Sequence, residues 1–391
     1  MRAAFVTNIC AHYRIKTFEL LARLYDMDYF FYSASDEWYW QRQHGVRSGD
    51  FNHKYMKGFR IGHTRIAPSL ITELLSVDYD IYLKCINGRF ALPVTYLISR
   101  IRRKPFILWT GIWMRLQTPA HKLFFPVTRF LYRHSDAIVT YGEHVKRYLI
   151  EEGVPAEKIF STKWAVDNDN YNRPVTEDEQ RRLRDRLDIA PHQKVVLYLG
   201  RLEQSKGLPY LLEAISKIDH DDAVLLIVGT GSEEKRLRRM ANEKGMEGRT
   251  RFAGYVETEK TLPYYSIAWV YVLPSITTNY FKEAWGLVVN EAMNQGVPVI
   301  ATDAVGAAAG GLIRDGINGY IVPERDSPAL AARIEQLLQD PGLRRRMGQN
   351  AKECMKTWGN EEMVQGFARA IDYVLDRNKS TQEAILSPAV Y

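Results

Sequence analysis

Short apolar runs alternate with segments of helical periodicity along the second half of the chain. The strand-like runs cover residues 194–200, 223–228, 250–252, 269–273, 299–301 and 320–322. The segments with apolar positions at helical spacing cover residues 210–218, 232–244, 258–266, 286–294, 328–338 and 342–356. Strands that alternate with helices predict right-handed βαβ units around a parallel sheet whose two faces are both covered.

The first half of the chain repeats this pattern less regularly. Its strand-like runs cover residues 3–7, 29–32, 81–84, 106–109 and 137–140, and its helix-like segments cover residues 16–24 and 145–152. The stretch 164–193 is polar, and we expect it to link two domains. The sequence therefore predicts an α/β protein with two doubly wound, Rossmann-like domains over residues 1–172 and 173–361. Such domains would face a central cleft at the carboxyl ends of their strands, where open α/β sheets bind ligands.

Composition places the chain among ordinary globular proteins. Its 391 residues are 46% apolar and 25% charged, and this length favours two domains. The three cysteines are far apart and form no CxxC pair, so we expect neither a disulfide framework nor a cysteine zinc site. The chain begins without a signal-peptide pattern, and no apolar stretch approaches about 18 residues. We therefore expect a cytoplasmic protein without a membrane span.

Positive charge is concentrated in the first half of the chain. Residues 1–175 hold 25 Lys and Arg against 16 Asp and Glu, whereas the remaining residues hold 28 against 30. Residues 51–150 alone hold 16 against 5. This asymmetry indicates an anionic partner, for which nucleic acid, an anionic membrane surface and a phosphorylated substrate are candidates. A basic surface that only keeps the protein soluble is the alternative.

One segment of this basic half combines charge with apolar surface. Arg115, Lys122, Arg129 and Arg133 recur at spacings of 7, 7 and 4 residues, which places them on one face of a helix. Apolar residues lie between them, and two prolines interrupt the segment. Such a segment can rest on an anionic leaflet. The alternative is a kinked helix whose apolar side packs on the first sheet.

Two common nucleotide-binding motifs are absent from the sequence. No GxGxxG follows the first strand, where residues 8–12 read NICAH, and no GxxxxGK[ST] occurs. Dehydrogenase and P-loop functions therefore lose support. No His, Asp and Glu residues have the spacing of a metal site, and residues 167–170 lack the downstream Gly and Glu of an EF-hand loop.

A loop at the carboxyl end of a predicted strand carries two cations. Residues 200–207 read GRLEQSKG and precede the helix-like segment 210–218. Gly200 permits a tight turn, and Arg201 and Lys206 supply positive charge. A diphosphate needs such fixed donors and charges beside a helix start. We expect both cations beside solvent, so that replacing either would spare folding. A solvated basic loop is the alternative.

A second candidate site lies around a short helix-like segment that starts near Gly286 and stops at Gly296, with Pro298 beyond. The amides from Gly286 through Val288 would bind a leaving phosphate. Glu291 lies about one and a half turns into this helix. Its carboxylate can accept hydrogen bonds from two hydroxyls of a sugar diol. The alternative for Glu291 is an exposed helix residue.

Six segments of the second half form a recognisable series. They read YLGR…KG at 198–207, LIVGTG at 226–231, FAGYV at 252–256, VLPS at 272–275, E…EAM at 283–293 and GVPVIATD at 296–303. In order and spacing this set resembles the retaining glycosyltransferases of family 4, which have the GT-B fold. The resemblance covers roughly residues 194–325. The run 358–375 is similar to the family's last helix, so we expect a C-terminal helix over about residues 362–391 that crosses back onto the first domain.

The resemblance implies a metal-independent transfer of a sugar, with retention, from a nucleoside diphosphate sugar to an acceptor hydroxyl. Arg201 and Lys206 would stabilise the leaving diphosphate, and Glu283 would orient the transferred sugar. Glu291 would hold the ribose. The expected donor-binding residues are Gly200, Val256, Trp285, Gly286, Leu287, Val288 and Glu291. No cofactor is expected beyond the donor itself.

The sequence departs from the family in three places, two of them in the first half. The glycine pair after the first strand is absent, and residues 108–113, LWTGIW, lack the histidine often found near the cleft. The loop after Asp303 lacks the usual acidic residue. We expect His12, Tyr13, Thr110 and Trp113 to contact the acceptor, and a packing role is the alternative for His12, Tyr13 and Trp113.

The sequence therefore predicts a glycosyltransferase of polysaccharide or glycolipid biosynthesis, peripheral at the inner face of a membrane. Its partners would be a nucleotide sugar, a glycan or lipid-linked acceptor and an anionic membrane surface, without nucleic acid. A sugar-nucleotide epimerase or phosphorylase of the same fold is one alternative. A non-enzymatic polyanion-binding module is another, and it would bind polyanions in a salt-sensitive way without sugar-nucleotide turnover.

Overall fold

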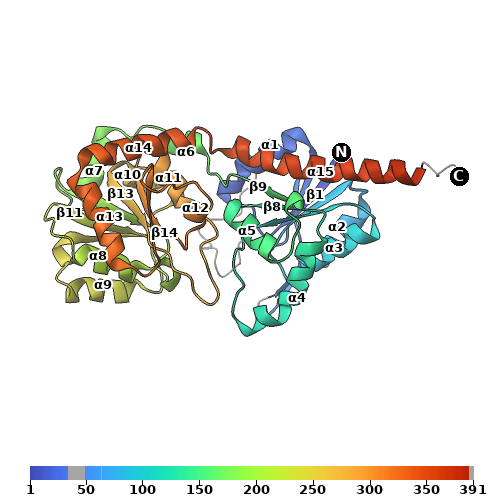
Figure 1. Ribbon diagram of the computed structural model, residues 1–391, viewed down its shortest axis with the longest axis horizontal. Coiled ribbons are helices and arrows are strands. Elements are labelled where there is room, and N and C mark those ends of the chain that lie inside the picture. The colour runs from blue at the N-terminus through green and yellow to red at the C-terminus, as the bar shows by residue number, and fades with distance from the viewer. Residues whose placement is uncertain (34–48, 63, 387–391) are drawn as a thin grey trace. The chain divides into compact units, whose positions relative to one another are not determined.

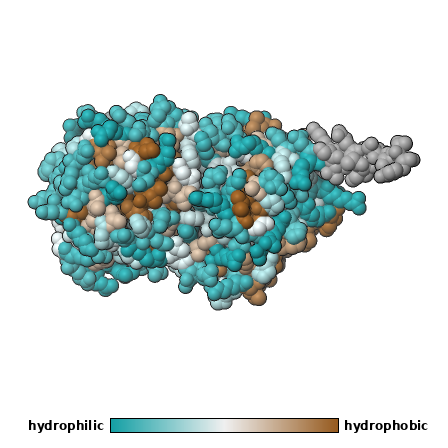
Figure 2. Space-filling model, in the orientation of Figure 1, coloured by the Kyte–Doolittle hydropathy of each residue, from teal (hydrophilic) through white to brown (hydrophobic). Residues whose placement is uncertain are grey.

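The chain forms two compact units. The computed structural model describes residues 1–33, 49–62 and 64–386, with side chains up to residue 377. The first unit comprises Met1–Gly111, Leu123–Trp164 and Asn360–Tyr391, and the second comprises Ile112–Lys122 and Ala165–Gly359. Each unit is built on a parallel sheet flanked by helices (Figure 1). The visible surface is mostly hydrophilic, with apolar areas on both units (Figure 2).

The first unit has a sheet of seven parallel strands among its described residues, in the order β3-β2-β1-β6-β7-β8-β9. The strands are β1 (Arg2–Thr7), β2 (Asp26–Phe31), β3 (His53–Tyr55), β6 (Ile81–Cys85), β7 (Phe106–Thr110), β8 (Ala137–Thr140) and β9 (Ile159–Ser161). An antiparallel hairpin pairs β4 (Phe59–Ile61) with β5 (Thr64–Ile66). Because both faces of a parallel sheet are covered, β6, β7 and β8 are buried along their whole length.

Helices cover this sheet. They are η1 (His12–Arg14), α1 (Ile15–Leu24), α2 (Ser69–Ser76), α3 (Ala91–Ile101), α4 (Pro119–His134), α5 (Glu143–Glu151), η3 (Ala156–Lys158) and α15 (Asn360–Leu386). The C-terminal α15 packs along α1, β8 and β9. Thr17 donates to the Asn360 side chain at 2.8 Å, and the Phe367 ring lies 5.4 Å from that of Trp109. The last helix is therefore part of the core of the first unit.

The second unit lies wholly within the described residues and has a sheet of six parallel strands in the order β12-β11-β10-β13-β14-β15. The strands are β10 (Lys194–Leu199), β11 (Ala223–Val228), β12 (Thr250–Gly254), β13 (Ala268–Leu273), β14 (Val299–Thr302) and β15 (Gly319–Val322). The helices are α6 (Asn168–Tyr171), α7 (Glu177–Arg186), η4 (Gln204–Lys206), α8 (Leu208–Ser216), α9 (Glu234–Glu243), η5 (Glu247–Arg249), η6 (Thr258–Lys260), α10 (Leu262–Ser266), α11 (Val288–Asn294), α12 (Gly306–Ala309), α13 (Ser327–Gln339) and α14 (Pro341–Met355). The predicted α/β class and doubly wound sheets are confirmed.

The expected linker over residues 164–193 is wrong. This stretch contains α6 and α7, and Leu183 of α7 is buried. A capping box between Thr176 and Glu179 starts α7. Arg186 then donates to the hydroxyl of Tyr264 on α10 at 3.0 Å. The polar stretch therefore contains a helix, α7, that packs on the second unit through few apolar side chains.

The units also divide at other residues than we expected. The boundary lies at Trp164–Ala165 instead of residue 172, because α6 packs on α11 of the second unit. Ile112–Lys122 belongs to the second unit as well. The C-terminal helix starts at Asn360 instead of about residue 362, and residues 387–391 of its predicted span lie outside the described residues.

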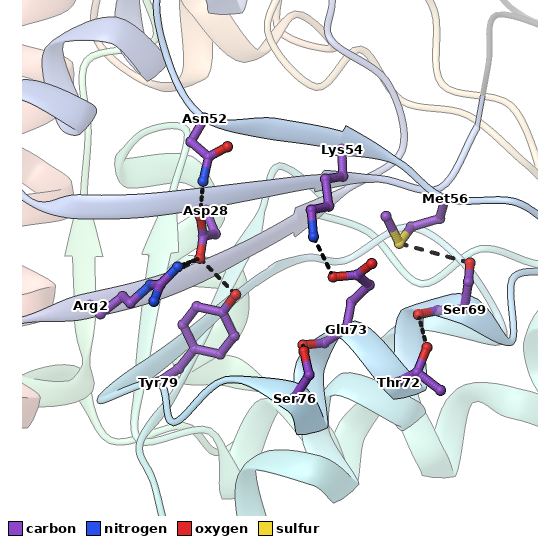
Figure 3. Close-up of polar contacts among 10 residues, drawn as sticks. All are labelled: Arg2, Asp28, Asn52, Lys54, Met56, Ser69, Thr72, Glu73, Ser76 and Tyr79. Atoms are coloured by element: carbon purple, nitrogen blue, oxygen red, sulfur yellow. Dashed lines mark hydrogen bonds and ion pairs between the residues drawn. The ribbon is translucent and has the colours of Figure 1, made fainter.

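A polar network around the buried Asp28 carboxylate lies at the amino-terminal edge of the first sheet (Figure 3). The Asp28 carboxylate accepts hydrogen bonds from Arg2 at 2.8 Å, from the Tyr79 hydroxyl at 2.7 Å and from the Asn52 side chain. These residues line a cavity of about 60 Å³. Because ligands of open α/β sheets bind at the opposite, carboxyl-terminal edge, this network serves stability.

None of the helices in the described part of the chain combines the length and the apolar character needed to cross a bilayer.

Candidate active site in the second unit

The loop between β10 and α8 is held in place by glycines and a buried tyrosine. Gly207 has a φ of 65°, and a Cβ there would lie 1.9 Å from the Pro274 carbonyl oxygen, so only glycine fits. The Tyr198 hydroxyl donates to the Arg201 carbonyl at 2.7 Å. These contacts fix the loop at the carboxyl end of β10, where a ligand of this sheet is expected.

Lys206 forms an ion pair with Glu283 in a nearly dry setting. The Lys206 ammonium donates to a carboxylate oxygen of Glu283, and 11% of each side chain is exposed. The buried Ser275 hydroxyl donates to the same oxygen at 3.1 Å. The expected solvent exposure of Lys206 is therefore wrong, because Glu283 and the loop after β13 cover it. The structure brings together two of the three residues that we assigned to catalysis.

Arg201, the third residue of that set, is oriented differently. It pairs with Glu203 of the same loop at 2.8 Å, and more than a third of its side chain is exposed. Solvent screens this pair, so Arg201 can exchange Glu203 for another anion at little cost. Its position beside solvent agrees with our expectation.

Glu291 lies in the core of the second unit. Only 8% of the residue is exposed, so the alternative of an exposed helix residue is wrong. Burial raises the pKa of this carboxyl to about 7, although hydrogen bonds from Tyr265 and Tyr171 act in the opposite direction. The Tyr265 hydroxyl donates to it at 2.7 Å. A ribose would have to share or replace these phenol donors.

A single buried phenol connects the two glutamates electrostatically. Burial raises the pKa of Tyr271, and the carboxyls of Glu291 and Glu283 add to this rise. The Tyr271 hydroxyl donates to the Leu199 carbonyl at the end of β10, at 3.1 Å. Both carboxyls therefore lie within electrostatic reach of one side chain at the carboxyl edge of the sheet.

The helix α11 is shorter than we expected. It begins at Val288, and Gly286 lies before it with a φ of 88°. A Cβ at Gly286 would lie 2.7 Å from the Leu273 side chain, so the turn into α11 requires glycine. The initial N–H groups of any helix lack intrahelical acceptors, and those near Leu287 and Val288 remain the predicted phosphate donors.

Trp285 and Val256 are two further donor candidates. Trp285 is 2% exposed, donates to the Asn290 side chain at 2.8 Å and stacks on Trp358. Its side chain is thus a packing element, and its backbone carbonyl accepts a hydrogen bond from the Ala307 N–H at 2.8 Å. Val256 follows β12 and is half-buried.

Trp113 packs against the loop that carries Glu283. Its indole N–H donates to the Glu283 carbonyl at 3.0 Å, and the Lys282 ammonium lies 3.7 Å from the ring centroid. Gln117 extends this contact, because its N–H donates to the Asn279 carbonyl at 2.6 Å. We predicted Trp113 as an acceptor residue of the first domain, but it lies in the second unit beside a catalytic candidate.

The other acceptor candidates lie in the first unit. His12 and Tyr13 are half-buried on η1, with their rings 5.3 Å apart. Thr110 ends β7, is fully buried and hydrogen-bonds Tyr132. Its burial favours packing over the acceptor contact that we expected.

Sequence reasoning missed four residues of this site. Ser275 lies in the recognised VLPS segment without an assigned role, and Lys282 directly precedes the recognised segment that starts at Glu283. Tyr171 and Tyr265 carry no sequence signal, because only the fold brings them to Glu291. Within the described residues, no three His, Cys, Asp or Glu side chains could together hold a metal ion.

Comparison with known proteins finds glycosyltransferases. A family model described as "Glycosyl transferases group 1" matches residues 179–354. The chain is 29% identical to alpha-D-kanosaminyltransferase of Streptomyces kanamyceticus over 284 residues, which covers 69% of this chain and 71% of that protein. It is 32% identical over 186 residues to the lipopolysaccharide core biosynthesis glycosyltransferase LpsE of Rhizobium meliloti, which covers 48% of this chain and 49% of LpsE.

A solved structure extends the likeness to nearly the whole chain. HepE of Anabaena, in complex with UDP, superposes with a TM-score of 0.74 at 19% identity, and the match covers 95% of this chain and 100% of HepE. The chain spans only about half the length of some curated relatives, such as LpsE. The family model and the relatives support a glycosyltransferase, and the two parallel-sheet α/β domains have the GT-B fold.

Proposed function

We propose that the protein is a retaining, metal-independent glycosyltransferase of family 4. It transfers a sugar from a nucleoside diphosphate sugar to an acceptor hydroxyl during polysaccharide or glycolipid assembly. The observation that carries this proposal is the pair of Lys206 and Glu283 with Ser275, at the carboxyl edge of β10 and β13. A cation and a carboxylate held together there can serve a phosphate and a sugar hydroxyl.

In this proposal Lys206 and Arg201 stabilise the departing diphosphate. A transition state of oxocarbenium character develops negative charge on the leaving phosphate, so fixed cations lower the barrier more than they tighten the ground state. The amides around Leu287 and Val288 add donors at the same group. Because Lys206 already pairs with Glu283, donor binding would redistribute that ammonium between the carboxylate and the diphosphate.

Glu283 orients the transferred sugar in this proposal. Ser275 fixes one carboxylate oxygen and Trp113 holds the backbone carbonyl, so Glu283 has little freedom before substrate arrives. Such preorganisation keeps the acceptor hydroxyl and the leaving diphosphate on one face of the sugar, as retention requires. The charges come from side chains, so the reaction needs no metal or cofactor beyond the donor.

Glu291 holds the ribose in the proposed complex. Buried carboxylates are rare unless paired, and Glu291 accepts hydrogen bonds from the phenols of Tyr265 and Tyr171. A buried carboxylate is energetically costly, and its presence here agrees with a ligand that supplies further hydroxyl donors to Glu291. The remaining donor contacts would come from Gly200, Val256 and the turn at Gly286.

The acceptor in this proposal is a glycan or a lipid-linked sugar at the cytoplasmic face of an anionic membrane. LpsE is named for lipopolysaccharide core biosynthesis, and another relative is named phosphatidyl-myo-inositol mannosyltransferase, of Mycobacterium leprae. The basic first half supports an anionic surface or substrate.

A donor panel tests the proposal. Purified protein is titrated with UDP-, GDP- and ADP-sugars by calorimetry, and nucleotide release is followed with and without EDTA. UDP-glucose is the first member, because HepE has been solved with it. We expect the sugars of one nucleotide to bind. We also expect EDTA to leave the rate of nucleotide release unchanged. Epimerised donor without any release would assign the protein to another class, and salt-sensitive polyanion binding without turnover would make it a binding module.

A further inference from the structure

The first unit exposes an apolar face on α3 and α4. Leu123 is 74% exposed and Ile101 is 73% exposed, although both are large aliphatic side chains. Together with their neighbours they form what we call the α3–α4 face, made of Leu97, Ile101, Leu123, Phe124, Val127 and Phe130. Apolar surface lies along the lower margin of this unit in Figure 2, over the position of these helices. Gathered apolar patches on a protein surface mark interaction sites.

The two helices lie side by side, so that these residues form one surface. The rings of Tyr96 on α3 and Phe130 on α4 are 6.0 Å apart, and Arg100 donates to the His134 carbonyl at 2.9 Å. Leu97 and Ile101 are four residues apart on α3, which places them on the same side. Leu123, Val127 and Phe130 follow the same rule on α4.

The face points outward because α4 packs through its other side. Leu131 and Tyr132 are 3% and 1% exposed and turn into the first unit. The alternative that the apolar side of this segment packs on the first sheet is therefore wrong for Leu123, Phe124, Val127 and Phe130. Burial of Leu131 and Tyr132 anchors the helix, and Phe125 is half-buried. Leu123, Phe124, Val127 and Phe130 remain exposed.

The chain segment that carries this face is basic and has no acidic residue of its own. Asp136 and Glu152, which lie outside this segment, pair with Arg100 and Arg129. Residues 81–135 contain ten Lys or Arg and no Asp or Glu. The Arg89 guanidinium lies 5.9 Å from the Phe124 ring, Arg103 lies two residues after the end of α3, and Lys122 precedes Leu123. A partner for this surface must accept apolar side chains and carry negative charge around them.

We propose that the α3–α4 face docks the protein on an anionic phospholipid bilayer, with the apolar residues inserted among the lipids and Arg89, Arg103 and Lys122 against the headgroups. A bilayer offers hydrocarbon beneath anionic charge, which is the chemistry this surface complements. The inference deepens the proposed function, since a lipid-linked acceptor would be met at such a surface. It does not depend on the donor site.

Two basic residues of the segment have other contacts. Arg129 lies 3.5 Å from the Glu152 carboxylate, and Arg133 donates to the Glu152 carbonyl at 3.0 Å. They tie α4 to the end of α5, so they are unsuitable for neutralisation. The anchoring charges are Arg89 and Lys122, near Phe124 and Leu123, and Arg103, two residues after Ile101. Apolar insertion distinguishes this docking from purely electrostatic adsorption. Added salt should weaken it without abolishing it, because salt screens only the charges.

Co-sedimentation of the full chain with vesicles tests the proposal. Phosphatidylcholine vesicles with and without phosphatidylglycerol are compared at low and raised salt. We expect binding that requires phosphatidylglycerol. Arg89→Gln, Arg103→Gln and Lys122→Gln together should lower the partition coefficient about a hundredfold, at about fivefold per charge. Leu97→Gln, Ile101→Gln, Leu123→Gln and Val127→Gln together should lower it at least about tenfold.

Matched controls separate the face from general properties. Lys235→Gln, Arg236→Gln and Arg239→Gln remove three exposed charges from α9 of the second unit, and Leu24→Gln with Ile317→Gln removes exposed apolar residues elsewhere. Both controls should bind as the wild type does. Equal losses in controls and face variants would overturn the proposal, and so would binding independent of lipid charge or no binding. A lipid-free dimer lost in the apolar variant would assign the face to a second copy of the chain.

Nucleotide binding in the absence of vesicles keeps this inference separate from the proposed function. Variants of the α3–α4 face that bind nucleotide normally but no longer sediment with vesicles would support the docking proposal. Wild-type protein that binds vesicles but no nucleotide would overturn the donor proposal alone.

Discussion

Lys206 and Glu283 carry opposite charges where little water reaches, with 11% of each side chain exposed. Removing one partner of such a pair leaves the other charge buried without compensation, which costs about 3–5 kcal/mol. Arg201 and Glu203 form a pair of the same kind beside solvent, where the cost falls to about 0–1 kcal/mol. The same chemistry therefore has different consequences for folding at two positions of one loop.

We expect Lys206→Ala to lower both the unfolding temperature and sugar-nucleotide turnover. Arg201→Ala, as its control, should spare the unfolding temperature while it weakens nucleotide binding by about 1.5–3 kcal/mol, the value of a charge-assisted hydrogen bond. The double variant Lys206→Met with Glu283→Gln removes both charges and should recover stability without turnover. Thermal unfolding and nucleotide-release assays measure these effects. Normal turnover in Lys206→Ala would exclude Lys206 from the reaction.

The two glutamates should differ in what they bind. Glu291→Ala is expected to weaken the binding of bare nucleoside diphosphate, since Glu291 would hold the ribose. Glu283→Ala should not weaken the binding of bare nucleotide but should lower turnover, since the sugar is the only part of the donor that Glu283 would contact. Because this variant frees Lys206 for the diphosphate, any change in bare-nucleotide affinity should be a gain. Calorimetry with nucleoside diphosphate on both variants decides between them, and equal losses of affinity would refute the division of roles.

Glu291 should also make stability depend on pH. Burial raises its pKa from 4.5 to about 7, so between these values the folded protein binds more protons than the unfolded chain. Stability from this group is therefore present below about pH 4.5 and is lost as pH rises through 7. We expect Glu291→Gln to match the wild type at pH 4.5 and to exceed it at pH 8 by about 1–3 kcal/mol. Denaturant unfolding at both pH values measures the difference, and a constant difference would contradict it.

The segment 112–122 packs against the loop that carries Glu283. Trp113 donates its indole N–H to the Glu283 carbonyl at 3.0 Å and offers its ring to Lys282. Trp113→Phe keeps the ring and removes only the donor. We expect kcat to fall about fivefold, in line with the loss of one hydrogen bond of about 1 kcal/mol, while nucleotide affinity stays unchanged. Steady-state kinetics with calorimetry provide the measurement; an equal loss in affinity would indicate a general packing role instead.

The predicted strands were recovered because buried parallel strands are nearly continuous apolar runs. The run predicted over residues 223–228 is β11 with the same bounds, and it is buried along its whole length. α7 escaped notice because its sequence, EDEQRRLRDR, contains a single apolar residue, Leu183. Its signal was the capping box at Thr176 and Glu179, a local hydrogen-bond pattern that hydrophobic periodicity does not register.

The candidate site was predictable to the extent that its residues stand in contiguous motifs. Lys206 and Glu283 are 77 positions apart, and the series of segments around them suggested a common ligand without indicating their direct contact. We assigned Trp113 to the wrong unit. A sequence does not indicate that a short segment between two parts of one domain packs on the other domain. Contacts of this kind depend on tertiary packing alone.

At the scale of the whole molecule, the proposed tasks divide between the two units. The donor residues Arg201, Lys206, Glu283 and Glu291 all lie in the second unit, whereas the α3–α4 face belongs to the first. Each unit has its own parallel sheet and its own buried core. A ligand of one unit should therefore stabilise that unit before it affects the other.

Calorimetric unfolding should separate the two units. Asp28→Ala leaves the Arg2, Tyr79 and Asn52 donors without their shared acceptor and should cost the first unit about 2–4 kcal/mol. A nucleoside diphosphate at about 100 times its Kd should stabilise the second unit by about 2.7 kcal/mol. We expect two transitions, of which Asp28→Ala lowers one and the nucleotide raises the other. If both perturbations shift a single transition, the units unfold together, because the energy that couples them then exceeds the difference in their separate stabilities.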